Sequence, residues 1–368
     1  MVNKSQKQVA GKDSTQIQAQ SINIYSGITE ERAREISRET MLQVLEKCAF
    51  ESGAVAQQRI EAFQDIVLPR IESIEKNFVS FSDPAFQVLY KKAQISAACS
   101  GRELDYGMLS ELIAHRINNK DNIKKKASIE KAVEIIDKID EDALCGLTMM
   151  HVMSQFCPVS GSISQGLLVI NNLYSKIQYI DLPCDKTDWM DNLDILGAAR
   201  IQSVTSFKKF SEYIMGSWDG YVCCGIKKES PQYELAINKL KEVGLPDDFL
   251  IDNELLDGYV RIPVVNKEKI DELQLLVQID GITTQSSILL SEQQKTVVAE
   301  IFEMYDKTPA LVKTTQEAFK NKLRSYEAIE KAHVWWDHLK PYFQITSIGR
   351  AIAQANAKRI DQSLPDLD

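Results

Sequence analysis

The histidines are the first residues to test for chemistry, and they do not form a catalytic or metal-binding pattern. Only four are present, and His333 and His338 are five residues apart. That separation misses the spacing of four that puts two metal ligands on one helix face. His115 and His151 fall in amphipathic or apolar helical patterns and are interpreted as core or boundary residues. We predict no catalytic residue, no bound metal and no cofactor.

The seven cysteines are odd in number and lie scattered through apolar sequence. This usage is typical of reduced residues in a cytoplasmic protein and not of a disulfide framework. Cys223 and Cys224 are adjacent in a predicted strand, so their side chains should point to opposite faces and cannot bind one metal together.

Carboxylates leave an enzymatic alternative open. They gather at 137–142, 185–194 and 252–257, and carboxylates brought together by a fold can hold two divalent cations for phosphodiester cleavage. The alternative function is therefore a metal-dependent nuclease or phosphodiesterase. The same clusters are also expected at the loops and helix ends of any acidic protein.

Two segments have a composition that contacts phosphate in other proteins. Lys124-Lys-Lys126 stands at a predicted helix start, where basic residues oppose the helix dipole, and is interpreted mainly as a solvated loop. Ser160-Gly-Ser-Ile-Ser-Gln-Gly166 only loosely resembles a phosphate-binding loop. It lacks both the preceding strand and the Lys-Ser/Thr ending.

Composition indicates an acidic globular protein. The 368 residues carry a formal net charge of −9, with 44% hydrophobic and 26% charged residues. A chain of this length has room for two or three domains with a substantial core. The charge argues against broad nucleic-acid or membrane binding, although a local basic patch is compatible with it. No secretory signal or transmembrane run is visible, so we expect a cytoplasmic protein.

Residues 14–28 are predicted to form a β-ribbon that follows a disordered tail over residues 1–13. Apolar residues alternate with glutamine, asparagine and serine, and the phase of the alternation shifts near Gln20-Ser21. A short ribbon leaves unpaired backbone groups at its edges. We expect it to join copies of the chain into a homo-oligomer or, alternatively, to add a strand to the body. The predicted assembly residues are Ile17, Ala19, Ile22, Ile24 and Tyr25.

The same segment carries a resemblance. The run from Ile17 to Ile36 reads IQAQSINIYSGITEERAREI. It is similar to a segment at the front of various bacterial proteins, several of them from antiviral defence or conflict systems. The whole chain resembles an uncharacterised bacterial family that carries this segment, with similarity extending through residues 257–260 and 345–359. The resemblance implies a defence context and supplies no catalytic residue.

A helical domain is predicted over residues 29–205. Thr29 is a suitable N-cap for a long helix running to about Lys76, with interruptions at Gly53 and Pro69. It is expected to be either a stalk or two to three helices of an ordinary bundle, with the bundle slightly favoured. Further helices are expected at 84–99, 103–117, 127–140, 142–156 and 162–178.

A small α/β unit is predicted over residues 206–285. Asp219-Gly-Tyr-Val222 recurs as Asp257-Gly-Tyr-Val260, and each copy precedes an apolar run and a helical pattern, at 231–243 and 267–279. This predicts a strand–helix unit occurring twice, with a crossover between neighbouring strands. The alternative is a β-hairpin packed on helices.

The last segment, residues 286–368, resembles a winged-helix unit. A capping box at Ser291 and Gln294 opens three predicted helices, which a strand and a final helix follow. Its 11 Lys and Arg balance its 11 Asp and Glu, which favours a protein partner over DNA, although a DNA-binding regulator is a further alternative. The predicted partner-binding residues are Trp335, Trp336, Arg350 and Arg359.

Together these features predict a mainly α protein with a small α/β portion. It would consist of an N-terminal β-ribbon, a long helix and helical body, a strand–helix unit and a C-terminal winged-helix-like domain. The predicted function is that of a self-assembling, non-enzymatic component of a bacterial defence or conflict system, acting through oligomerisation and protein–protein contacts.

Overall fold

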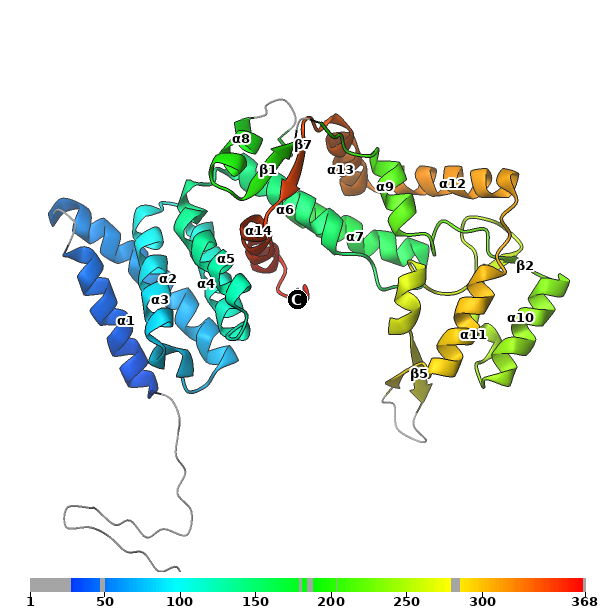
Figure 1. The fold of residues 1–368 in the computed structure, drawn as a ribbon, viewed down its shortest axis with the longest axis horizontal. Coiled ribbons are helices and arrows are strands. Elements are labelled where there is room, and N and C mark those ends of the chain that lie inside the picture. The colour runs from blue at the N-terminus through cyan, green and yellow to red at the C-terminus, as the bar shows by residue number, and fades with distance from the viewer. Residues whose placement is uncertain are drawn as a thin grey trace, which may run out of the picture.

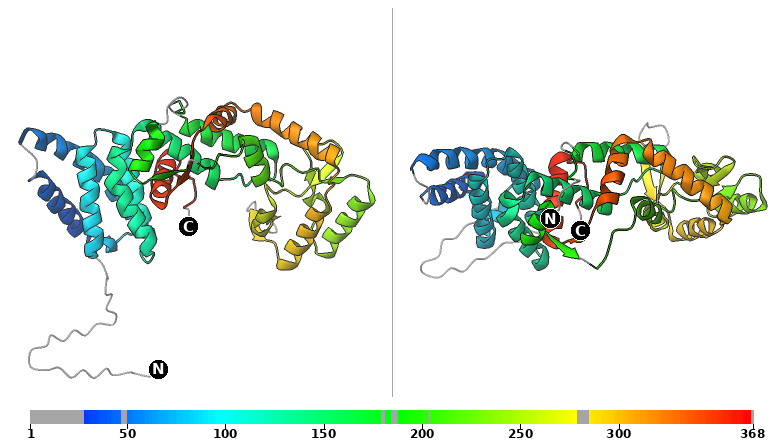
Figure 2. Two further views of the ribbon diagram at one scale, coloured as in Figure 1. Left: turned by 45° about the horizontal axis from the view of Figure 1, so that its top comes forward. Right: turned by 90° about the horizontal axis from the view of Figure 1, so that it is seen from above.

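A computed structural model describes residues 28–46, 50–178, 181–183, 188–202, 204–278 and 285–366. The fold is mainly α with a few small sheets, as predicted (Figure 1). The predicted ribbon and its assembly residues Ile17 to Tyr25 lie outside the described residues. In the described part, no helix is both long enough and apolar enough to cross a membrane. The molecule is elongated in all views, with helices α1–α5 at one end and α10–α11 at the other (Figure 2).

The N-terminal end is a helical bundle. It consists of α1 (Glu30–Leu45), α2 (Phe50–Ile74), α3 (Pro84–Cys99), α4 (Glu103–Asn118) and α5 (Ile123–Ile135). Thr29 caps α1 by accepting from the Arg32 amide, and Asp83 caps α3 with Pro84 in the first turn.

The long-helix prediction needs a correction, because the segment forms two helices, with α1 ending at Leu45 and α2 beginning at Phe50, and neither helix ends at Gly53 or Pro69. Both residues lie inside α2. The buried side chains of Phe63, Val67 and Ile71 hold α2 against the bundle on both sides of the proline. Tertiary packing therefore outweighs the local preference of proline for a helix end. The bundle alternative is confirmed, and no stalk forms.

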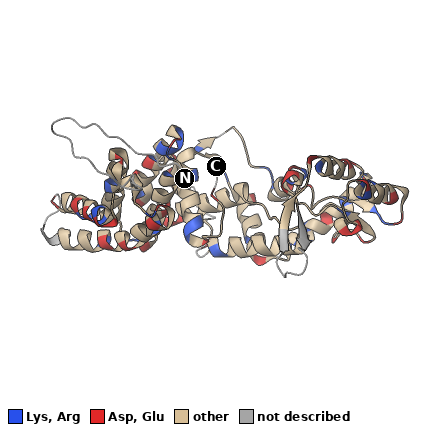
Figure 3. Ribbon diagram, turned by 90° about the horizontal axis from the view of Figure 1, so that it is seen from below, with Lys and Arg blue, Asp and Glu red and all other residues tan. Residues whose placement is uncertain are grey.

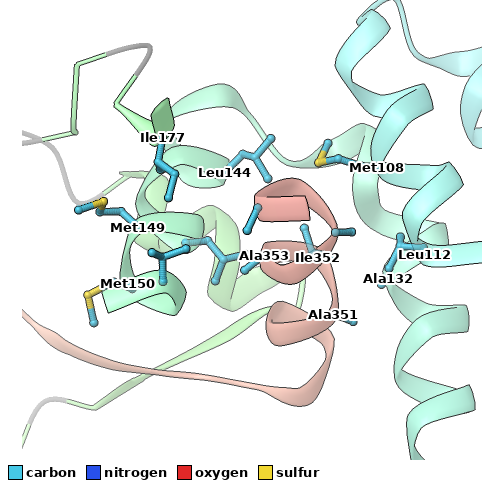
Figure 4. Packing of buried hydrophobic residues seen from close by; sticks show 14 of the residues in the cluster. Met108, Leu112, Ala132, Leu144, Met149, Met150, Ile177, Ala351, Ile352 and Ala353 are labelled. Carbon is cyan, nitrogen blue, oxygen red and sulfur yellow. The ribbon is translucent and has the colours of Figure 1, made fainter. Parts of the chain in front are cut away.

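The middle of the molecule is built around the helix nearest the C-terminus. Helix α14 (Ser347–Ile360) packs against α4, α5 and α6 (Glu141–Gln155), so it lies between the bundle and the rest of the body (Figure 4). Nearly every side chain of α14 from Ala351 to Lys358 is buried. Gly349 in its first turn lies against the Ala198 carbonyl, and a Cβ there would come within 2.0 Å of that oxygen.

Three further helices and one strand pair complete the middle. They are α7 (Ile163–Ile177), α8 (Asp188–Ile195), α13 (Glu327–His338), β1 (Ala199–Gln202) and β7 (Tyr342–Ile345). β1 and β7 pair antiparallel, with Ala199 opposite Ile345. This pairing joins segments more than a hundred residues apart in the sequence.

The predicted winged-helix unit is not confirmed. Its elements occur in the expected order, with the capping box of Ser291 and Gln294 formed as predicted. They pack, however, on different parts of the protein. Helix α11 (Glu292–Glu303) contacts α10 (Pro231–Glu242), α13 contacts α7, and β7 pairs with β1. Residues 286–368 therefore do not form a separate domain.

The α/β end is an antiparallel arrangement and not a crossover unit. Strands β2 (Ile226–Lys227), β4 (Tyr259–Arg261) and β3 (Ile251–Asp252) pair in that order, and β5 (Gln274–Gln278) pairs with β6 (Gln285–Leu289). Helices α9 (Phe210–Ser217) and α12 (Pro309–Arg324) connect this end to the middle.

The predicted strand–helix repeat is wrong at its first strand and second helix. Asp219-Gly-Tyr-Val222 forms turns, and β2 begins only at Ile226. The predicted helix 267–279 is a 3₁₀ helix at Lys267–Glu272 followed by β5. Helix α10 matches the first predicted helix.

Candidate functional site

A cavity of about 760 Å³ opens between α4, α5, α6 and α14. We call it the basic cavity, because its charged side chains are Lys124 and Lys125 from α5 and Arg350 from α14. His115 from α4 and His151 from α6 also line it. No Asp or Glu is among the described residues of its wall. This composition is notable in a chain whose net charge is −9.

The three cations of the basic cavity have no carboxylate partner among the described residues. Within the described part of the chain, the side chains of Lys124, Lys125 and Arg350 form no ion pair and no hydrogen bond. Elsewhere in the protein many lysines and arginines pair with acidic residues, and basic and acidic residues are mixed along the helices (Figure 3). Among the described side chains these three cations lack a paired countercharge, which favours a positive potential in the cavity.

Two helix starts border the basic cavity. Lys124 and Lys125 lie in the first turn of α5, and Ser347 opens α14 and bonds to Ser128 through their hydroxyl groups at 2.9 Å. Neither helix has an acidic residue in its first turn. Helix starts carry partial positive charge and attract anions, so lysines there are unfavourable unless an anion is present.

His151 is the buried group of the site, with 1% of its surface exposed. Gln354 donates through its amide nitrogen to the Pro365 carbonyl at 2.8 Å, which turns its amide oxygen toward His151 Nε2 at 3.0 Å. Nε2 therefore carries the proton, and Nδ1 is left buried without a described partner. Burial is the main cause that lowers the pKa of His151. The hydrogen bond with Gln354 opposes this shift, and the charge of nearby Arg350 adds to it.

His115 lines the cavity from α4 and is half-buried. Burial is the main cause that lowers its pKa, and the charges of Lys125 and Lys358 lower it further, while Asp366 opposes the shift. Both histidines are therefore biased toward the neutral form by burial and by cations around them. An anion placed among these groups would favour protonation of both rings.

A second cavity of about 560 Å³ adjoins the first. We call it the aromatic cavity, because Phe207, Tyr213, Trp336, Tyr342 and Phe343 line it. It shares His151, Gln155 and Arg350 with the basic cavity, so the two are neighbours across these side chains. Lys208 is its other charged lining residue, and no described carboxylate lines it.

The loop Ser160–Gly166, considered above as a phosphate-binding segment, is occupied by a carboxylate of the protein. Glu254 accepts bonds from the Ile163 amide at 2.7 Å and from the Ser164 amide at 3.0 Å. It also accepts from the hydroxyl groups of Ser162 and Ser164 and pairs with Lys322 at 3.0 Å.

These contacts shift the titration of Glu254. Burial alone would raise its pKa, but the hydrogen bonds from Ser164 and Ser162 and the pair with Lys322 outweigh burial and lower the pKa to about 2. The backbone amides at the start of α7 therefore have an acceptor from within the protein. The contacts of Glu254 join the α/β end to the helical body.

The predicted partner-binding tryptophans need a correction. Trp335 is 1% exposed and Trp336 is 4% exposed. Their indole N–H groups donate to the backbone carbonyls of Pro183 and Lys208. They fix α13 to the body and do not present a surface to a partner, because large aromatic side chains are more stable in the core than in water.

The two predicted partner-binding arginines lie in different surroundings. Arg350 is exposed and lines both cavities. Arg359 donates to the Asn356 side chain at 3.0 Å and lies against Gly107 of α4. Only Arg350 is therefore part of the candidate site.

The remaining groups considered from the sequence do not converge. His333 contacts Glu330 and stacks on Phe210, while His338 donates from Nδ1 to the Val334 carbonyl. Cys223 and Cys224 lie in a loop and contact different partners, the Gly220 carbonyl and the Thr315 hydroxyl. Across the described ranges, no three His, Cys, Asp or Glu side chains are grouped so that they could hold a metal ion.

The cavity was not predictable as a unit, because its cations are more than two hundred residues apart in the sequence. The available signal was the triplet Lys124–Lys126 at a helix start, which the dipole disfavours. Nothing local connects that triplet to Arg350 or His151. Only the packing of α14 between the other helices brings them together.

Comparison with known proteins identifies a family and no activity. No curated protein and no solved structure matches the chain. A protein-family model whose description, “:-like”, states no function, matches residues 27–367. The match covers the whole described body, and the predicted ribbon lies almost entirely before it. The chain therefore belongs to the family that this model defines.

Proposed function

We propose that the protein binds an anionic, phosphate-bearing small molecule in the basic cavity. The observation that carries this proposal is the set of three unpaired cations, Lys124, Lys125 and Arg350, around a buried histidine with an unpartnered nitrogen. Grouping like charges without a counterion is unfavourable, because each raises the energy of the others. A bound anion removes that repulsion.

The shape of the site favours a small ligand over a nucleic-acid duplex. The volume of about 760 Å³ falls in the range of small-molecule cavities. A duplex binder needs a stripe of basic residues that matches the phosphate spacing. Here basic and acidic residues are mixed along the ribbon (Figure 3).

The test is calorimetric titration of the full chain with pyrophosphate at low salt. The double variant Lys124→Gln, Lys125→Gln should weaken binding at least tenfold, as should Arg350→Gln. The matched control is Lys126→Gln, which removes the same charge from the same turn but does not line the cavity. Equal losses in all three variants, or no binding by the unaltered protein, would overturn the proposal.

We also propose that residues 14–27 form a separate assembly element. The supporting observations are the alternating apolar pattern and the family match, which begins at residue 27. Changing both Ile22 and Ile24 to Asp should reduce the solution mass from that of an oligomer to that of a monomer, with helical content unchanged. An unchanged mass would contradict this second proposal.

The bacterial defence role is a proposal that rests on the resemblance of residues 17–36, and the cytoplasmic location is a proposal that rests on the cysteine usage. Expression of the chain in a bacterial host should reduce plaque formation by at least one phage. The Ile22→Asp, Ile24→Asp variant should lose that protection if assembly is required. Equal plaque counts with and without the chain over a broad phage panel would count against the defence role.

A further inference from the structure

We infer that the ligand is a nucleotide whose phosphates lie in the basic cavity and whose base lies in the aromatic cavity. This inference rests on the proposed function, because it extends the same anion site. It adds a second recognition element that a phosphate alone does not use.

The two cavities are positioned to hold two parts of one molecule. Arg350, His151 and Gln155 line both, so the two spaces lie on either side of these side chains. Arg350 enters from the first turn of α14, and His151 and Gln155 come from the last two turns of α6. A ligand seated beside Arg350 therefore has the lysines of α5 on one side and the aromatic rings on the other.

The aromatic cavity offers stacking surfaces that are only partly used by the protein. Tyr213, Phe207 and Tyr342 are half-buried, unlike the core aromatic residues behind them. Tyr342 and Phe207 have ring centroids 4.6 Å apart, and Tyr213 stacks on Trp336 at 4.9 Å. These contacts hold the rings in place and leave part of each facing the cavity. Such rings bind the flat face of a nucleobase.

Three glutamines give the aromatic cavity groups that can bind a base edge. The side chains of Gln155, Gln202 and Gln344 are exposed and line the cavity. Gln202 is opposite Tyr342 in the β1–β7 pair, so it lies diagonal to Gln344, and its amide nitrogen donates to the Gln344 amide oxygen at 3.4 Å. An amide carries both a donor and an acceptor, which is the pattern that a base edge presents.

The charged residues are distributed between the two cavities in a way that matches the two halves of a nucleotide. Lys124 and Lys125 border only the basic cavity, while the aromatic cavity has Lys208 and the shared Arg350 as its charged groups. No described carboxylate lines either space. The highest density of positive charge is thus separated from the stacking rings, as the phosphates of a nucleotide are separated from its base.

The experiment compares nucleoside triphosphates with phosphate probes that lack a base, by calorimetry on the full chain. The probes are ATP, GTP, CTP and UTP against inorganic triphosphate and ribose 5-phosphate, all without metal. At least one nucleoside triphosphate should bind about tenfold or more tightly than triphosphate, because stacking of one base contributes an increment of that size. Triphosphate should still bind, through the basic cavity alone.

Variants separate the two halves of the site. Tyr342→Leu should lower nucleotide affinity to the level of triphosphate and leave triphosphate affinity unchanged. Tyr213→Leu tests the same wall from α9 if Tyr342→Leu disturbs the β1–β7 pair, which a thermal melt will show. Arg350→Gln should weaken both probes.

The outcomes distinguish this inference from the proposed function. Equal affinity for triphosphate and all four nucleotides would overturn the nucleotide assignment and leave anion binding intact. Failure of every probe to bind would overturn both. Tighter nucleotide binding that Tyr342→Leu and Tyr213→Leu both leave unchanged would also refute the placement of the base.

Discussion

Two sites at helix starts in this protein attract negative charge, and their positive groups are treated in opposite ways. At the start of α7, the protein supplies its own anion, because Glu254 bonds to the Ile163 and Ser164 amides and pairs with Lys322. At the starts of α5 and α14, the basic cavity contains Lys124, Lys125 and Arg350 and no described carboxylate. The positive groups at the start of α7 have a carboxylate partner from the protein itself, and those of the basic cavity have none among the described residues.

The comparison shows that two segments with an anion-binding composition can have different roles, one structural and one proposed to be functional. The loop before α7 has the serines and glycines of an anion-binding loop, yet its role is to join the α/β end to the helical body. The lysine triplet of α5 has the composition of a solvated turn, yet two of its members, Lys124 and Lys125, line the basic cavity. What matters is whether the fold brings a carboxylate to the positive groups.

The strongest test of the comparison is to give the basic cavity an internal anion. Ser347→Glu places a carboxylate in the first turn of α14, beside the lysines of α5. We expect pyrophosphate affinity to fall on the order of 100-fold, because the new charge competes for the same cations. The melting temperature should rise, since the helix start gains a favourable charge. Calorimetry and thermal melts provide the two measurements.

The control for this change is Ser347→Gln, because glutamine has nearly the same size as glutamate and carries no charge. It should keep most of the anion affinity. A loss as large as that of Ser347→Glu would mean that shape, and not charge, determines binding.

The converse test removes the internal anion of α7. Glu254→Gln should lower the free energy of unfolding by about 1–2 kcal/mol after allowance for solvent screening, because charged hydrogen bonds at a helix start are lost. Pyrophosphate affinity should not change. Denaturant unfolding measures the effect, and Asp257→Asn, an exposed change in the turn that follows, is the matched control.

The difference in stability between the unaltered protein and Glu254→Gln should depend on pH. The folded pKa of Glu254 is about 2, below its ordinary value of 4.5. A carboxylate with a lowered pKa stabilises the fold fully above its unfolded pKa and loses this effect as pH falls toward the folded value. The stability difference between the unaltered protein and Glu254→Gln should therefore shrink between pH 4.5 and about 2. A difference that is constant through this range would contradict the assignment.

A smaller effect is expected on the pH dependence of anion binding. His151 and His115 have lowered pKa values in the free protein, and a bound anion favours their protonation. Affinity should therefore rise several-fold as pH falls below about 6.5, the ordinary histidine value. The charged groups facing these rings are Arg350 at His151, and Lys125, Lys358 and Asp366 at His115.

Sulfate is the appropriate probe for this measurement, because its charge is constant in the range. His151→Gln should flatten the pH profile. A profile of the same steepness in that variant would show that His151 does not take up the proton.

The smallest expected effect is on the stability of the ligand-free protein. Lys124 and Lys125 lie at a helix start, where positive charge costs about 0.3–1 kcal/mol each. The double glutamine variant should therefore be slightly more stable than the unaltered chain while binding anions less well. Lower stability of that variant in denaturant unfolding would mean that the lysines serve the fold.

Local features of the fold were largely predictable from the sequence. The N-cap of Thr29, the Asp83-Pro84 helix start and the capping box at Ser291 and Gln294 all occur as expected. Helix α3 has the predicted bounds. Each of these features depends on residues within one or two turns, so the sequence window contains its cause.

Features that depend on distant contacts were not predictable. Pro69 continues a helix because the bundle holds α2 on both sides of it. Strand β7 pairs with β1 and not within its own segment, which separates it from the expected winged-helix arrangement. The candidate site could not be predicted for the same reason, because His151 and Arg350 come together only through the packing of α14.

The position of α14 has a consequence for how the protein is made. This helix fills the space between α4, α5 and α6, yet it is synthesised after nearly every other element. Until residues 347–360 leave the ribosome, the nascent chain exposes an apolar trough where Ile352 and Ala353 will lie. Chaperones should therefore bind the unfinished chain most strongly just before α14 emerges. The basic cavity takes Ser347 and Arg350 from this helix, so a chain that ends before residue 347 lacks one wall of the proposed anion site.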